Sequence, residues 1–93
     1  MLFVVTGYFK PGIDPAPADL QADFNEHLAQ TNLRIRAAGP LLDRGGRRVG
    51  FMGIIETEGF DHAQTFLNDS PYAKAGLYDR LEVAEYINEV GTP

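Results

Sequence analysis

The sequence predicts a single α+β domain, and three observations lead to this class. The chain has 93 residues, of which 44% are hydrophobic and 23% are charged, a composition typical of one folded domain with one core. Its segments follow the order strand, helix, strand, strand, helix, strand. Short Gly-, Pro- and Asp-containing turns separate them. These features favour an antiparallel sheet with two helices on one face, formed by residues 1–93.

The first half of the chain contains a strand and a long helix. Leu2–Phe9 is rich in β-branched and aromatic residues and ends at the turn signal Lys10–Gly12, so it predicts a strand. A helix is expected to begin at Ala18 or Asp19 and to continue to about Leu33. Its core-facing residues, which recur at helical spacing, are Leu20, Phe24, Leu28, Thr31 and Ile35.

The second half is expected to hold a hairpin, a short helix and a final strand. Ala37–Pro40 interrupts the helical pattern, so the second strand is predicted only at Leu41–Leu42. A polar turn over Asp43–Arg48 leads into the return strand. The expected later elements are a strand over 49–57, a helix over 60–67, a helical turn ended by Gly76 and a strand over 79–87.

This order is that of the ferredoxin-like βαββαβ fold. The first and third strands are apolar at both odd and even positions, so both faces of the sheet need an apolar cover. The two helices cover one face. We therefore expect a second copy of the chain to cover the other face, in a homodimer with an isologous interface.

Composition excludes several classes of function. Thirteen acidic against eight basic residues give a net charge of -5, which disfavours nucleic-acid and anionic-membrane partners. The chain has no cysteine, so it has no disulfide or thiolate metal site, and we expect a cytoplasmic protein. Its first apolar run is too short to span a bilayer. No phosphate-loop or dinucleotide-binding spacing is present, and we expect neither a cofactor nor a bound metal.

Two segments resemble those of YCII-related (YciI-like) proteins, namely Ala38–Leu42 and Ser70–Tyr78. The resemblance implies a dimeric α+β barrel built from ferredoxin-like halves. It also implies an active-site pair formed by a histidine on the first helix and an aspartate before a Pro-aromatic dipeptide. In this sequence the candidates are His27 and Asp69, while Ser70 stands directly before Pro71. Gly39, Pro40 and Tyr72 belong to the same two segments and are candidate ligand-binding residues.

The candidate catalytic residues also have simpler interpretations. The His27 imidazole is suited to act as a general base near neutral pH, or it is a surface residue with Asp23 one turn away. Asp69 has the chemistry to orient His27 or bind a substrate hydroxyl, and Ser70 to donate a hydrogen bond. Both residues also suit a helix cap or a turn before proline. The arginines of segment 44–48 suit anion binding or a solvated hairpin tip.

The leading functional hypothesis is a small cofactor-independent enzyme. It would be a lyase, isomerase or dehydrohalogenase that acts on a small organic molecule through proton transfer at His27. We expect His27, Asp69 and Ser70 to converge on one cleft. The alternative function is a non-catalytic dimeric ligand-binding or accessory module that recognises a small molecule in this cleft. A purely structural interaction domain is a third interpretation.

Overall fold

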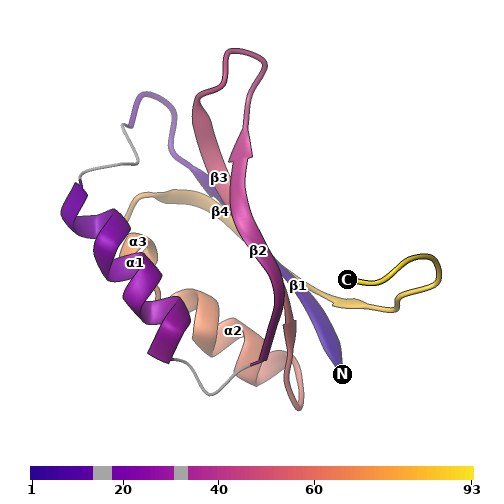
Figure 1. The fold of residues 1–93 in the computed structure, drawn as a ribbon. Coiled ribbons are helices and arrows are strands. Elements are labelled where there is room, and N and C mark those ends of the chain that lie inside the picture. The colour runs from indigo at the N-terminus through magenta and orange to yellow at the C-terminus, as the bar shows by residue number, and fades with distance from the viewer. Residues whose placement is uncertain (14–17, 31–33) are drawn as a thin grey trace.

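The computed structural model describes residues 1–13, 18–30 and 34–93. Its elements are β1 (Leu2–Phe9), α1 (Ala18–Gln30), β2 (Arg34–Leu42), β3 (Arg48–Glu56), α2 (Phe60–Asn68), α3 (Pro71–Lys74) and β4 (Tyr78–Tyr86). The four strands form one antiparallel sheet in the order β2-β3-β1-β4. The helices lie together on one side of this sheet (Figure 1). The predicted ferredoxin-like α+β fold is therefore confirmed.

The core lies between the helices and the two central strands. Phe3 and Val5 of β1 pair with Ile55 and Gly53 of β3, and these residues alternate with side chains that point to the opposite face. Phe3, Val5 and Ile55 are completely buried. Burying one large apolar side chain contributes roughly 1.5–3 kcal/mol to stability. The alternation in β1 and β3 thus fixes which face receives the helices.

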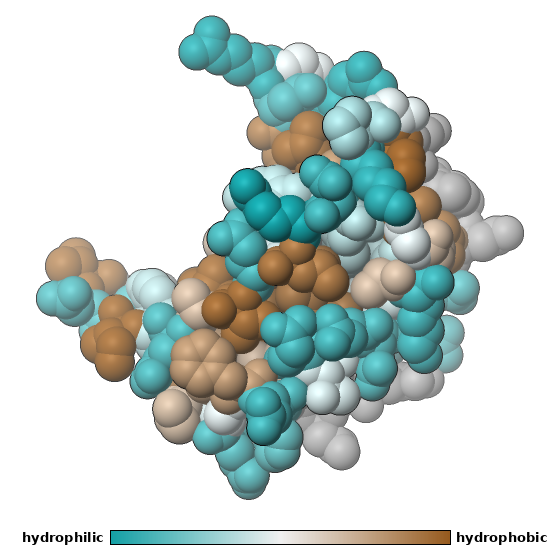
Figure 2. Space-filling model, turned by 180° about the vertical axis from the view of Figure 1, so that it is seen from behind, coloured by the Kyte–Doolittle hydropathy of each residue, from teal (hydrophilic) through white to brown (hydrophobic). Residues whose placement is uncertain are grey.

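The opposite face of the sheet is also apolar but less well covered. Val4 pairs with Ile54, and Thr6 pairs with Met52, and all four residues are only partly buried in the single chain. Figure 1 shows no helix over this side of the sheet. Apolar side chains also reach the molecular surface in the middle of the view from behind, between hydrophilic groups (Figure 2). None of the described helices is long and apolar enough to cross a membrane.

The prediction for β2 was wrong in length. The strand runs from Arg34 to Leu42 and not only over Leu41–Leu42. Because β2 is an edge strand, Pro40 costs it no hydrogen bond with a further strand. Ile35, expected on the core-facing side of the first helix, instead lies in β2 opposite Ile55. The last recorded helical residue is Gln30, and Thr31 lies outside the described residues.

The other boundaries agree with the predictions to within one or two residues. The hairpin turn after β2 forms as expected, because Asp43 Oδ1 accepts hydrogen bonds from the backbone nitrogens of Gly45 and Arg47 at 2.9 and 3.0 Å. The helical turn before the last strand is α3, and Gly76 follows it with a φ of 73°. That left-handed conformation favours glycine.

Gly50 provides a test of how closely β1 and β3 approach. A Cβ atom at this position would collide with the backbone carbonyl oxygen of Gly7 and lie 3.3 Å from the Tyr8 Cα. Because backbone atoms in a central strand cannot move aside easily, Gly50→Ala should lower the free energy of unfolding by about 1–3 kcal/mol. Urea denaturation measures this change.

Gly39→Ala is the matched control, since a Cβ atom at Gly39 on β2 would meet nothing within 4 Å. It should change the free energy of unfolding much less. Equal losses in the two variants would contradict the close approach.

Candidate functional site

Within the described part of the chain, two hollows lie beside α1. The more enclosed one has a volume of about 230 Å³ and is called the aromatic cavity below. Its backbone floor includes Gly39 and Gly50. Its polar side chains are Gln21, Asn25, Arg48 and Tyr72, and its apolar ones are Phe9, Phe24, Leu28, Ala38, Pro40 and Phe51. The cavity therefore combines an apolar wall with a few polar groups, as small-molecule sites generally do.

The apolar wall contains aromatic rings that pack against one another. Phe24 of α1 packs edge-on against Phe51 of β3, with ring centroids 4.8 Å apart. It also contacts Tyr72 of α3 at 4.7 Å, and Phe9 of β1 meets Tyr72 at 5.3 Å. Such edge-to-face and tilted pairs are favourable beyond the area they bury. The same contacts that hold α1 to the sheet thus shape the cavity.

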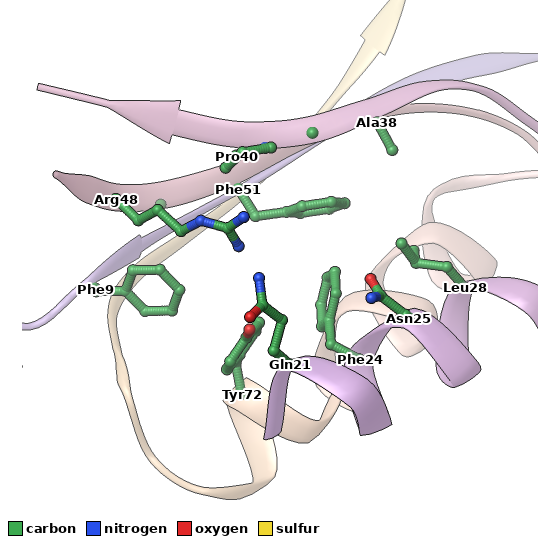
Figure 3. A pocket seen from close by; sticks show the side chains of 12 residues that line it. Phe9, Gln21, Phe24, Asn25, Leu28, Ala38, Pro40, Arg48, Phe51 and Tyr72 are labelled. Carbon is green, nitrogen blue, oxygen red and sulfur yellow. The ribbon is translucent and has the colours of Figure 1, made fainter. Parts of the chain in front are cut away.

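Arg48 brings a positive charge to this wall. It is the first residue of β3, and its guanidinium group extends across the cavity toward α1 (Figure 3). The side-chain oxygen of Gln21, when turned toward Arg48, accepts hydrogen bonds from Nη1 at 2.7 Å and Nη2 at 3.0 Å. Figure 3 draws this amide with its nitrogen toward the guanidinium, where two donors would face each other. When the amide is turned, its oxygen accepts the hydrogen bonds that the guanidinium donates.

Tyr72 contributes a neutral hydroxyl group. Burial raises the pKa of the Tyr72 hydroxyl, and the positive charge of Arg48 offsets part of that rise. The pKa stays above its ordinary value, so the phenol is protonated near neutral pH and can donate a hydrogen bond. Arg48 and Tyr72 are the ionisable side chains among the described residues that line the cavity.

Tyr78 packs against a residue of this wall without lining the cavity itself. Its ring stacks on Phe9 with centroids 5.1 Å apart. Burial, with a further contribution from nearby Tyr72, strongly raises the pKa of the Tyr78 hydroxyl, and Ser70 acts in the opposite direction. Within the described part of the chain, this buried hydroxyl makes no hydrogen bond of good geometry. Tyr78 is therefore a neutral packing residue under the cavity wall.

The second hollow is a shallow depression on the neighbouring side of α1. His27 and Asp69 both line it, together with Asp23, Glu26, Pro71 and Lys74. The His27 Nε2 lies 3.1 Å from the Phe66 carbonyl oxygen, so Nε2 carries the proton that it donates. In the neutral ring the lone pair is then on Nδ1. No group of three potential metal ligands is found among residues 1–13, 18–30 and 34–93.

Ser70 has a structural task in this region. Its side chain is 1% exposed, and its hydroxyl donates to the Leu67 carbonyl at 2.8 Å and accepts from the Ala73 amide at 3.3 Å. It is the N-cap of α3, which is the simpler of the two interpretations of the sequence. Neither hollow, as formed by the described residues, is lined by Ser70.

The candidate residues thus divide between two places. Gly39, Pro40 and Tyr72 line the aromatic cavity, whereas His27 and Asp69 line the depression. The catalytic and binding roles of these residues stay predictions. Sequence reasoning missed Gln21 and Phe24 as cavity residues, and it treated Arg48 as part of a hairpin tip. The sequence contained one signal for Arg48 as a binding residue, namely the anion-binding chemistry of the arginines at 44–48.

Comparison with known proteins assigns the family. Residues 1–87 match the YCII-related domain, and the chain belongs to this family. It is similar to a solved structure of 5-chloro-2-hydroxyhydroquinone dehydrochlorinase (TftG) from Burkholderia phenoliruptrix AC1100 in complex with 2,5-dihydroxybenzoquinone. The sequence identity is 26%, the similarity covers 96% of each chain, and the TM-score is 0.86. No curated protein matches the chain. The chain is thus a YciI-like protein with a fold close to that of a dehydrochlorinase.

The pKa of Tyr72 tests whether the Arg48 charge reaches into the cavity. A positive charge favours the phenolate form, so Arg48→Met should raise the pKa of Tyr72 further above its ordinary value. Carbon-13 NMR of the labelled tyrosine ring, followed against pH, measures the change. Arg47→Met, in the exposed turn beside it, is the control and should leave this pKa unchanged. An unchanged or lower pKa in Arg48→Met would contradict the assigned geometry.

Proposed function

We propose that this chain is a cofactor-independent enzyme that binds a small oxygenated ring in the aromatic cavity and catalyses an elimination or isomerisation by proton transfer. One observation carries the proposal. The Arg48 guanidinium and the neutral Tyr72 hydroxyl are the ionisable groups among the described residues that line the cavity, and three phenylalanine rings form part of its apolar wall. A flat ring with an oxygen anion at its edge complements this arrangement.

The size of the cavity supports a one-ring ligand. Its volume of about 230 Å³ lies below the range of roughly 300–1,000 Å³ that is usual for drug-sized ligands. TftG was solved with 2,5-dihydroxybenzoquinone, which is a single ring with oxygen substituents. This ligand is therefore the natural first probe for the present chain.

The proposed chemistry uses the charge of Arg48. When one ring hydroxyl loses its proton, a carbonyl bond forms and the ring carbon that bears the leaving group takes up a proton and becomes tetrahedral. Loss of the proton of a second hydroxyl then forms a second carbonyl bond, and the leaving group departs with its bonding pair, so that the net change is loss of one acid molecule, HX. The step needs no external oxidant or reductant. Arg48 would stabilise the oxygen anion before and during this change, and Tyr72 would donate a hydrogen bond to a second oxygen.

The proton acceptor in this proposal lies outside the lining of the aromatic cavity. His27 remains our proposal, because it is an imidazole on the same helix as the cavity residues Gln21 and Phe24. The alternative function, ligand binding without catalysis, is favoured by a specific observation. His27 Nε2 is engaged by the Phe66 carbonyl and Ser70 by its capping bonds, so neither is aimed at the aromatic cavity.

Calorimetric titration with 2,5-dihydroxybenzoquinone tests the proposal. Arg48→Met should weaken binding by about tenfold or more, since one charge-assisted contact is lost. Arg47→Met removes the same charge from the neighbouring exposed turn and should bind like wild type. His27→Ala separates the two functions, because the enzyme hypothesis predicts lost turnover of a halogenated hydroxyhydroquinone with binding retained. Absence of binding by wild type, or equal binding by both arginine variants, would contradict the proposal.

We also propose that the chain forms a homodimer through the open face of the sheet. Val4, Met52 and Ile54 are partly exposed there in the single chain, and a second copy would remove them from water. Light scattering should give twice the mass of one chain, and Ile54→Asp should shift the protein to monomer. Thr65→Asp, on the exposed side of α2, is the control and should stay dimeric. A monomeric wild type at micromolar concentration would contradict this interface.

The cytoplasmic location expected from the sequence stays a prediction.

A further inference from the structure

We infer that Gln21 is a positioning residue that makes the aromatic cavity selective for anionic ligands, because it holds Arg48 with a neutral amide in place of a carboxylate. The inference rests on the proposed function, since it concerns the charge of the ligand in the same cavity. It adds a residue and a property that the proposed function does not require.

The other arginines with recorded side-chain partners show the contrast. Arg34 and Arg36 face Glu56 at 3.8 and 2.9 Å, and Arg80 faces Glu82 at 3.0 Å. In each of these pairs a carboxylate compensates the positive charge. Arg48 instead meets the amide oxygen of Gln21 at 2.7 and 3.0 Å. An amide satisfies the donors of the guanidinium but leaves its net charge in place.

The surroundings of Arg48 preserve this charge. Among the described residues that line the aromatic cavity, none is an aspartate or a glutamate. The same positive charge lowers the pKa of the Tyr72 hydroxyl on the cavity wall, against the larger rise that burial causes. A bound anion would therefore meet a cation whose charge is not already neutralised.

Gln21 also directs the guanidinium group. Arg48 is an exposed residue at the start of β3, and a long side chain in this position would otherwise sample many rotamers in solvent. The two hydrogen bonds to Gln21 on α1 draw the guanidinium across the cavity, where it lies between Pro40 and Gln21 in the view of Figure 3. Its donors that are not used by Gln21 remain for a ligand, because a guanidinium has five N–H groups.

Gln21→Glu changes the charge at this contact with almost no change in shape. The new carboxylate would pair with Arg48 and cancel the positive charge that an anionic ligand needs. A neutral ligand of the same size would lose little. We therefore use benzenesulfonate as the anionic probe and benzenesulfonamide as its uncharged counterpart, both measured by calorimetric titration near neutral pH.

Wild type should bind the sulfonate more tightly than the sulfonamide. Gln21→Glu should weaken sulfonate binding by about tenfold or more while changing sulfonamide binding by less than about twofold. Gln21→Met, which loses the acceptor without adding a charge, should fall between wild type and Gln21→Glu for the sulfonate. Gln64→Glu is the matched control, because Gln64 is an exposed residue of α2 bonded to Asn68, and it should bind both probes like wild type.

Three outcomes would overturn the inference: no preference of wild type for the sulfonate, equal loss of both probes in Gln21→Glu, or unchanged sulfonate binding in that variant. Equal loss would mean that Gln21 acts only on the structure of the cavity. Different outcomes would contradict the proposed function. These are no binding of the quinone by wild type, or quinone binding that Arg48→Met leaves unchanged.

Discussion

The packing of Phe24 against Phe51 and Tyr72 is the contact on which the rest of the site depends. Phe24 belongs to α1, Phe51 to β3 and Tyr72 to α3, so three elements distant in sequence meet in one group of rings. All three side chains are buried in the core, yet the same side chains line the aromatic cavity. Stability and ligand recognition are therefore coupled here, and large-to-small substitutions would damage both.

Helix α1 divides the functional side of the molecule. Gln21, Phe24 and Leu28 turn toward the aromatic cavity, whereas Asp23 and His27 turn toward the depression that also contains Asp69. The cavity has the cation, the neutral phenol and the aromatic walls that a small anionic ring requires. The depression has the imidazole and carboxylates that proton transfer requires. In our proposal the cavity binds the ligand, and His27 in the depression accepts the proton.

Much of the fold could be predicted from the sequence, because its strongest patterns are local. The β-branched and aromatic residues of β1 and the helical spacing of Leu20, Phe24 and Leu28 need no tertiary information. The full length of β2 was missed because Ala37–Pro40 has no strand pattern of its own and is held by pairing with β3. The Gln21–Arg48 contact was missed for the same reason. Nothing local in either segment indicates that a helix and a hairpin end will meet.

The central claim is that the aromatic cavity, with Arg48 as its cation, is where this protein binds its ligand. A crystal structure of the chain with 2,5-dihydroxybenzoquinone tests it most directly. Our account predicts the ring inside the aromatic cavity, against the wall formed by Phe24, Phe51 and Tyr72, with one of its oxygens accepting hydrogen bonds from the Arg48 guanidinium. A ring bound in the depression beside His27 and Asp69, with the aromatic cavity containing only water, would contradict it.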